Sequence, residues 1–188
     1  MPLIDTNAHL SRWPFRRVAN DTAPALVAKL KRLSITEAWA GSYDALLHRD
    51  LSAVNERLAA DCRRHGAGFL QPIGCVNPSL PDWEEDLRRC AEVYKMKGIR
   101  LYPNYHQYDL TDARFKKLLA MTAARGLLVQ IAVMMVDERT QHPLVRVPHV
   151  NTAPLIGLLK QTPKARVMLL NCFRTVRGGL LLKLRATR

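Results

Sequence analysis

The sequence predicts an α/β fold with a parallel sheet, and two observations carry that prediction. Short apolar segments alternate with longer amphipathic segments along most of the 188 residues, which indicates five strand–helix units followed by a sixth strand. Apolar residues make up 48% of the chain and charged residues 24%, so one domain can bury a sizeable core. Right-handed crossovers between parallel strands are the usual way to join such units.

The first elements are a strand, a helix and a second strand. The strand is expected at about 3–9, where a short apolar stretch runs into polar residues. The helix is expected over 21–33, because Asp21 or Thr22 can cap its first turn and apolar residues then recur on one helical face. The second strand is expected at 35–42, which ends in a Gly-Ser pair.

The middle of the chain repeats this alternation. A helix over 50–66 is expected to end at Gly66, in the C′ position that favours glycine. A third strand is expected at 68–78. A long helix is then expected over 79–98, with acidic residues in its first turn and basic residues near its end. A fourth strand is expected at 99–105.

The remaining elements follow the same order. A fourth helix is expected over 111–126 and a fifth strand over 127–135, which is apolar almost throughout. Such a run is typical of a strand that is buried on both faces. A fifth helix is expected over 151–163 and a sixth strand over 165–173.

Two architectures accommodate these units, an open doubly wound sheet and a (β/α) barrel. An open sheet often carries a Gly-rich phosphate loop after its first strand, whereas here that strand ends in Asp-Thr-Asn-Ala-His. Barrel enzymes place polar residues at the carboxyl ends of their strands. We therefore predict a TIM-barrel-like fold over 1–173, with about six of the eight strands present. Residues 174–188 are expected to form an atypical basic tail.

The excess of basic residues lies mainly in the last part of the chain. Residues 139–188 contain 10 Lys and Arg and no Asp or Glu, whereas the rest contains 19 basic and all 16 acidic residues. Phe173 is the one aromatic residue in this part, and no nucleic-acid-binding module is recognisable, so we do not expect a nucleic-acid partner. We expect a chain that is truncated relative to a complete barrel, with open sheet edges that favour self-association.

Other sequence features point to an ordinary cytoplasmic protein. No apolar run reaches the roughly 18 residues that a membrane span needs, and no signal peptide is expected. The cysteines show no CxxC pattern, so we expect small buried side chains and neither disulfides nor a zinc knot. They are Cys62, Cys75, Cys90 and Cys172.

The end of the first strand is the first candidate site. Side chains alternate along a strand, so Asp5, Asn7 and His9 should share one face. In a barrel that face can point toward the mouth, where polar groups two residues apart can grip one metal ion or one substrate group. The alternative is structural, because Asx residues often bond loop backbone and His9 can be an ordinary hydrogen-bonded histidine.

Three motifs resemble those of the amidohydrolase-related family, which contains metal-dependent hydrolases and non-oxidative decarboxylases. The stretch IDTNAHLSRWPF resembles the family's D-x-H-x-H opening. GIRLYP resembles its fourth-strand motif G-(I/V)-(R/K)-L-x-P, and RGLLVQIAV resembles its fifth-strand motif G-L-P-V-x-x-H. The resemblance extends to about Phe173 and implies a TIM barrel that acts on a small-molecule substrate.

The resemblance also implies a divalent metal, with Zn²⁺ the expected ion, held by His9 and Asn7. Of the family's five ligand positions, His9 is the one clearly kept. The first falls on Asn7, the fifth-strand position near Ala132, and the sixth-strand position near Asn171. Amide oxygen is a poor zinc ligand beside imidazole, so the alternatives are metal-free chemistry and a catalytically degenerate chain.

Other polar residues near the strand ends are candidates for chemistry. Arg100 on the fourth strand suits a substrate carboxylate through a bidentate pair. His106, just after that strand, can act as a general acid or base near neutral pH. Four further residues are expected to bind the substrate: Tyr102, Arg139, His142 and Asn171.

The resemblance implies a hydrolase that acts on a C–N or C–O bond of a small carboxylated substrate. One alternative is a decarboxylase of the same family, acting on aromatic or keto acids. The other is a non-catalytic remnant or binding protein, an interpretation that the scarcity of ligand residues supports.

Overall fold

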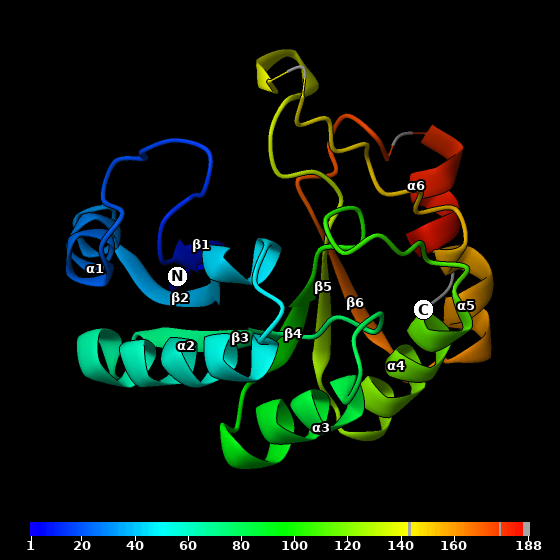
Figure 1. Ribbon diagram of the computed structural model, residues 1–188, viewed down its shortest axis with the longest axis horizontal. Helices are drawn as coiled ribbons and strands as arrows, with labels where there is room; N and C mark the ends of the chain where they lie inside the picture. The colour runs from blue at the N-terminus through cyan, green and yellow to red at the C-terminus, as the bar shows by residue number, and fades with distance from the viewer. Residues whose placement is uncertain (143, 177, 186–188) are drawn as a thin grey trace. The chain divides into compact units, whose positions relative to one another are not determined.

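The structure, a computed structural model, describes residues 1–142, 144–176 and 178–185. These residues form two compact units. The first comprises 1–76 and 85–100, and the second comprises 77–84 and the residues from 101 onward. Each unit contains parallel strands and helices, and the strands follow chain order (Figure 1).

The first unit contains four parallel strands. Its elements are β1 (Leu3–Leu10), α1 (Ala23–Arg32), β2 (Ile35–Ser42), η1 (Tyr43–Leu46), α2 (Leu51–Gly66), β3 (Leu70–Cys75), the π-helical turn η2 (Arg89–Val93) and β4 (Gly98–Leu101). The strands pair in the order β1-β2-β3-β4. Between α2 and η2 lies α3 (Trp83–Arg88). The Asp50 carboxylate accepts the Ala53 N–H at 2.9 Å and caps the start of α2. The expected cap of α1 is not formed, because Thr22 is its N-cap residue but makes no side-chain cap bond.

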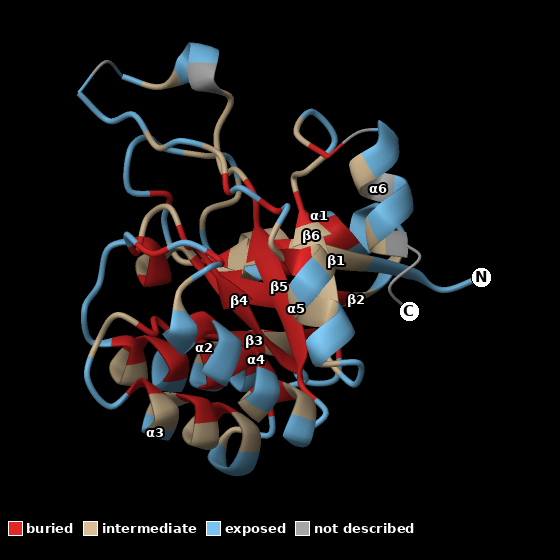
Figure 2. Ribbon diagram, turned by 90° about the vertical axis from the view of Figure 1, so that its right-hand side faces the viewer, coloured by how far each residue is buried: buried red, intermediate tan, exposed pale blue. Residues whose placement is uncertain are grey.

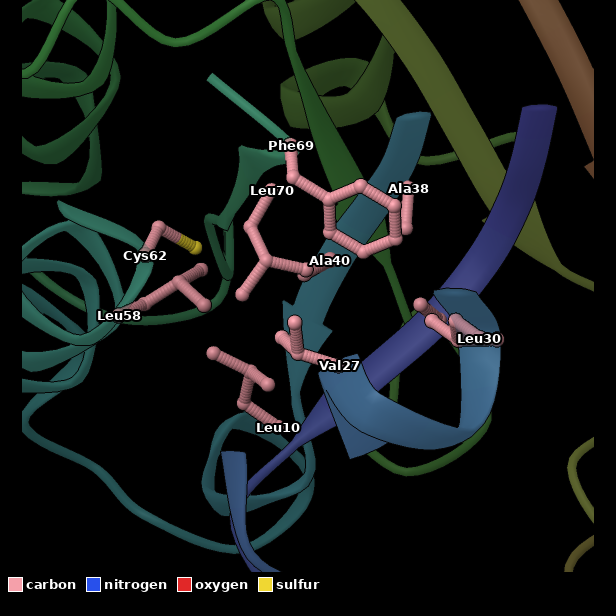
Figure 3. Close-up of a cluster of buried hydrophobic side chains, with 10 residues drawn as sticks. Leu10, Val27, Leu30, Ala38, Ala40, Leu58, Cys62, Phe69 and Leu70 are labelled. Atoms are coloured by element: carbon pink, nitrogen blue, oxygen red, sulfur yellow. The ribbon is translucent and has the colours of Figure 1, made fainter. Parts of the chain in front are cut away.

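A hydrophobic cluster fills the space between β1–β3 and the helices of the first unit (Figure 3). The helix α1 contributes Val27 and Leu30, the buried residues of its apolar face. Alanines on β2 are fully buried, and their small side chains let α1 and α2 pack closely against that strand. A buried leucine such as Leu30 contributes about 2 kcal/mol through its removal from water.

The second unit is built around the pair β5 (Leu128–Ala132) and β6 (Arg166–Leu170). Its helices are α4 (Ala113–Ala124), η3 (Glu138–Thr140), α5 (Leu155–Gln161) and α6 (Gly178–Arg185). Every residue of β5 is buried, as the apolar run predicted, and Figure 2 shows the whole strand in the colour of buried residues. Contacts join α4 to β5 and α5 to α6.

All six predicted strands are present, but several boundaries differ. The predicted fourth strand at 99–105 ends at Leu101, because Pro103 lacks an N–H and the chain turns there. The predicted long helix over 79–98 begins only at Trp83, after Asp82 with a φ of 57°, and it ends in the π-helical turn before Lys95 with a φ of 53°.

The expected role of Gly66 was wrong. Gly66 is the last helical residue of α2, and the left-handed conformation occurs at Gly68, with a φ of 76°. A Cβ atom on Gly66 would approach Cδ1 of Leu70 to 2.7 Å, so glycine is needed there for close packing against β3. The unexpected helix in the basic tail is α6. Tail residues 177 and 186–188 lie outside the described residues, and the boundary after residue 173 stays a prediction.

The prediction of buried cysteines is confirmed for three of the four. Cys62, Cys75 and Cys90 are buried and Cys172 is half-buried, and all four are free thiols. Among the described residues, none of the helices combines the length and the apolar character needed to cross a bilayer.

Candidate active site

The carboxyl end of β1 carries the first group of predicted site residues. The backbone N–H of Asn7 donates to Oδ1 of Asp5 at 2.9 Å, an Asx-type contact that orders the strand end. Nδ1 of His9 lies 3.1 Å from the backbone oxygen of Asn7. Since a carbonyl oxygen can only accept, Nδ1 carries the proton and donates it. Asp5, Asn7 and His9 line one cavity.

Arg100 of β4 reaches the same place in the first unit. Its side chain is 0% exposed. Nη1 lies 2.8 Å from Nε2 of His9 and donates to the backbone oxygen of Ala8 at 2.9 Å. Nη2 donates to the backbone oxygens of Thr6 at 3.2 Å and Trp39 at 3.3 Å. Four contacts therefore direct the guanidinium toward groups of the protein itself.

The approach of Arg100 depends on the glycine at position 41. Gly41 is the β2 residue paired with His9, and a Cβ atom there would lie 2.9 Å from Nη1 of Arg100. A side chain at position 41 would therefore require the guanidinium to shift. This arrangement does not support the expected bidentate pair between Arg100 and a substrate carboxylate. The guanidinium is buried, and it already donates to His9 and to backbone oxygens.

Electrostatics keeps His9 neutral. Burial lowers the pKa of His9 well below its ordinary value of 6.5, the positive charge of Arg100 lowers it further, and the bond to the Asn7 carbonyl opposes both. A neutral ring with its proton on Nδ1 has a lone pair on Nε2. That lone pair accepts from Arg100, so the pKa direction and the geometry agree.

Tyr43 forms an aromatic wall beside this pair, and the sequence analysis missed it. Its ring stacks on His9 with the centroids 4.4 Å apart and the planes 5° apart, and Trp13 meets Tyr43 edge-on at 5.2 Å. Burial raises the pKa of Tyr43, and the charge of Arg100 opposes that shift. A signal was present, since Tyr43 directly follows β2 and the ends of parallel strands share one edge.

The cavity next to this group has a volume of about 260 Å³. Besides the residues of β1, it is lined by Tyr43, by Lys29 of α1 and by Asp21. The carboxylate of Asp21 is paired with Arg17 at 2.8 Å. Lys29 is exposed and is one of the residues that line the cavity, and the sequence did not identify it as a site residue.

In the second unit, the structure brings Tyr102 and His106 together. Both side chains are buried, and their rings meet edge-on with centroids 6.0 Å apart. The backbone N–H of His106 donates to the backbone oxygen of Tyr102 at 3.0 Å, which closes the turn after β4. These two predicted residues therefore form one local group.

Arg139 lies on the surface in an ion-pair cluster. Its guanidinium donates to both oxygens of Asp137, at 3.1 and 2.8 Å, and Nη1 of Arg174 donates to the same carboxylate at 2.7 Å. Arg139 holds the pKa of Asp137 well below its usual range, and Arg174 adds a smaller effect. Because Arg139 and Arg174 are exposed, solvent screens the pairs and they add little stability.

The last two predicted residues have local backbone roles. His142 is exposed, and its Nδ1 accepts the Leu144 N–H at 3.2 Å. The side-chain amide of Asn171 donates to the backbone oxygen of Met134 at 2.8 Å, and Asn171 itself has a φ of 55°, which asparagine tolerates. The Asn171 bond joins the segments that follow β5 and β6, whereas the His142 contact is confined to its own loop.

The residues at β1 do not fit the divalent ion that the resemblance implies. A metal binds the lone pair of an imidazole nitrogen, and in His9 Nδ1 is protonated while Nε2 accepts from Arg100. In the part of the chain that the structure describes, no group of three or more His, Cys, Asp or Glu residues is placed to hold a metal ion. The expected pair His9 and Asn7 therefore lacks a free imidazole nitrogen, and among the described residues His9 belongs to no such group of three.

Comparisons with known proteins were informative on the family and the fold. A family model described as amidohydrolase matches residues 4–172. Among proteins with curated descriptions, none matches the chain significantly.

Solved structures share the fold at low sequence identity. A presumed amidohydrolase from Staphylococcus aureus is 9% identical, with a TM-score of 0.67 over 90% of this chain and 67% of that chain. For 2,6-dihydroxybenzoate decarboxylase from Rhizobium the values are 11%, 0.65, 90% and 66%. For manganese-bound 5-carboxyvanillate decarboxylase from Novosphingobium aromaticivorans they are 13%, 0.68, 89% and 65%. The chain thus spans about two thirds of these structures, and the predicted partial TIM-barrel fold is confirmed.

Proposed function

The chain belongs to the amidohydrolase family, and from this membership we propose that it acts on a small carboxylated substrate, with hydrolysis of a C–N or C–O bond as the first candidate reaction. The observation that carries the proposal is the cavity of about 260 Å³ at the carboxyl end of β1. That volume suits a small molecule, and barrel enzymes keep their sites at this end of the strands.

We propose that Lys29 holds the substrate carboxylate. Lys29 is a lysine among the residues that line the cavity, whereas the guanidinium of Arg100 donates to His9 and to backbone oxygens. Arg100 would then act as a positioning residue, which fixes the tautomer of His9. The predicted substrate ligands Tyr102, Arg139, His142 and Asn171 stay proposals. Asn7 and His9 are not proposed as metal ligands, because both ring nitrogens of His9 already have partners within the protein.

Hydrolysis also needs a base for the attacking water and an acid for the leaving group. His106, predicted for both transfers because imidazole accepts and returns a proton near neutral pH, belongs to the second unit and is not among the residues that line the cavity, so its role is a separate proposal. In the covalent step, the water oxygen bonds to the carbonyl carbon while its proton passes to the base. When the C–N or C–O bond breaks, the same proton is delivered to the departing nitrogen or oxygen.

The test is a substrate screen with matched variants. The purified chain is incubated with N-acyl amino acids and carboxylated lactones, with and without added Zn²⁺ or Mn²⁺, and products are identified by mass spectrometry. We expect Lys29→Met to raise KM at nearly constant kcat, and His106→Gln to lower kcat by about 100-fold or more. Arg32→Met on the same helix and the exposed His48→Gln are the matched controls. Turnover that is unaffected by either site variant would contradict the residue assignments.

Decarboxylation is the second candidate, and two observations favour it. The similar solved structures from Rhizobium and Novosphingobium aromaticivorans are decarboxylases of aromatic acids. In this chain an aromatic ring, Tyr43, lines the cavity, and a planar aromatic substrate can stack on such a ring. Release of CO₂ from hydroxylated benzoates would support this reaction over hydrolysis. Binding of these acids without any product would instead favour a non-catalytic binding protein.

A further inference from the structure

We propose that the guanidinium of Arg100 takes the place of a metal ion at β1. Nε2 of His9 then accepts a hydrogen bond from this internal cation, and the chain binds no divalent metal through His9. The inference concerns the same site as the proposed function, and the two are tested by different readouts. It starts from the contact of 2.8 Å between Nη1 of Arg100 and Nε2 of His9.

A metal ion and this guanidinium exclude each other sterically. A zinc ion on an imidazole nitrogen lies about 2.0–2.1 Å from it, along the lone pair. The same lone pair of His9 points to Nη1 of Arg100, so the ion would come within about 1 Å of that nitrogen. The other ring nitrogen offers no alternative, because Nδ1 lies 3.1 Å from the Asn7 carbonyl and donates its proton there.

Arg100 cannot easily move aside to admit an ion. Its side chain is fully buried, and it donates to three backbone oxygens, which would lose their partner if it left. Gly41 provides the gap through which the guanidinium lies against His9. Gly41 comes from β2 and Arg100 from β4, and the two residues meet at His9.

The charge of Arg100 and the types of residue around it also disfavour a divalent ion at His9. A divalent cation beside a fixed guanidinium would be repelled by a like charge at close range. The described residues also offer no set of three His, Cys, Asp or Glu that could offset this repulsion. The side chain of Asn7, where the family has a metal-binding histidine, adds no negative charge. The imidazole of His9 is therefore already paired with a cation that belongs to the protein itself.

The first experiment measures metal binding without any substrate. The wild-type chain and His9→Gln are dialysed against Zn²⁺ and, separately, Mn²⁺, and the bound metal per chain is determined by elemental analysis. We expect the two proteins to bind the same small, substoichiometric amount. Near-stoichiometric binding by the wild type that is lost in His9→Gln would overturn the proposal, whatever the enzyme assays show.

A second measurement observes His9 directly. Two-bond ¹H–¹⁵N spectra of histidine-labelled protein, assigned with His9→Gln, should show His9 with a protonated Nδ1 and an unprotonated Nε2. We expect these signals to stay unchanged when Zn²⁺ is added to the wild type. In Gly41→Ala the added Cβ displaces the guanidinium, so the Nε2 signal should shift, whereas in Gly157→Ala, where a Cβ meets nothing within 4 Å, it should not. A His9 signal in the wild type that follows the Zn²⁺ concentration would refute the inference.

Discussion

Among single residues, Arg100 has the largest expected effect on the stability of the first unit. It is a fully buried cation whose described acceptors are neutral, namely His9 and three backbone oxygens. Burial of a charge is tolerated only when its hydrogen bonds are satisfied. Each of these contacts joins β4 to β1 or β2, so one side chain connects strands that are distant in the sequence.

We therefore predict that Arg100→Met destabilises the protein by about 3 kcal/mol, because several buried acceptors lose their donor while one buried charge is removed. Urea unfolding followed by circular dichroism measures this change. Arg49→Met, at an exposed position, is the control and should change the free energy of unfolding by less than about 0.5 kcal/mol. Equal stability of the two variants would show that the contacts of Arg100 contribute little.

The buried thiols predict a loss of stability at alkaline pH. Burial raises the pKa of Cys62 to about 12, Asp61 adds to the shift and Arg63 opposes it. In the unfolded chain the thiol ionises near 9, so the protonated thiol favours the folded state below pH 9, and this contribution is lost as the pH rises from 9 to 12. We expect a fall of roughly 1 kcal/mol per pH unit from Cys62. Urea unfolding of Cys62→Ala above pH 9 should show a smaller slope than the wild type.

At some glycines of the helices and strands, close packing against neighbouring side chains matters more than the residue's helix or strand propensity. Gly66 ends α2, and a Cβ atom there would collide with the Leu70 side chain. A Cβ atom on Gly74 of β3 would lie 2.6 Å from Sγ of Cys90. Gly157 of α5 is exposed, with nothing near its missing Cβ. The same substitution should thus have opposite effects in different elements.

We predict that Gly66→Ala lowers the free energy of unfolding by about 1–2 kcal/mol, because overpacking exceeds the gain in helix propensity. Gly157→Ala should raise it by about 0.5 kcal/mol, since alanine restricts the unfolded chain and favours the helix. Thermal and urea unfolding of both variants measure the two signs. A stabilised Gly66→Ala would mean that Leu70 repacks without strain.

The strand predictions succeeded where the signal was local. The apolar run of β5 is visible in a few consecutive residues. The site was harder, because its contacts are not local: His9 and Arg100 are 91 residues apart, and the role of Gly41 depends on both. Periodicity places residues on a face, but it does not reveal that a buried arginine fills the space where a metal was expected.

At the scale of the whole molecule, the open edge of β1 is the feature with the clearest consequence. Within the described residues, β1 is an end strand of the sheet order, with β2 as its neighbour. Leu3 and Ile4 on this strand are 53% and 42% exposed. An exposed apolar edge strand can pair with another chain, and a charge on the edge prevents that pairing.

We predict concentration-dependent self-association of the wild type, reduced by Ile4→Lys. Light scattering coupled to size-exclusion chromatography measures the mass over a concentration series. Leu33→Lys is the control, because Leu33 is 57% exposed but lies at the end of α1 and not on a strand edge. A monomeric wild type at every concentration would contradict this prediction.

The edge-on contact of Trp13 with Tyr43 has a practical consequence. Tyr43 lines the cavity, and its ring centroid lies only 5.2 Å from that of Trp13, so light absorbed by the phenol passes efficiently to the indole. A molecule that enters the cavity would change this transfer and the tryptophan emission. The chain thus carries an intrinsic optical reporter of occupancy, which can screen candidate ligands before any reaction is known.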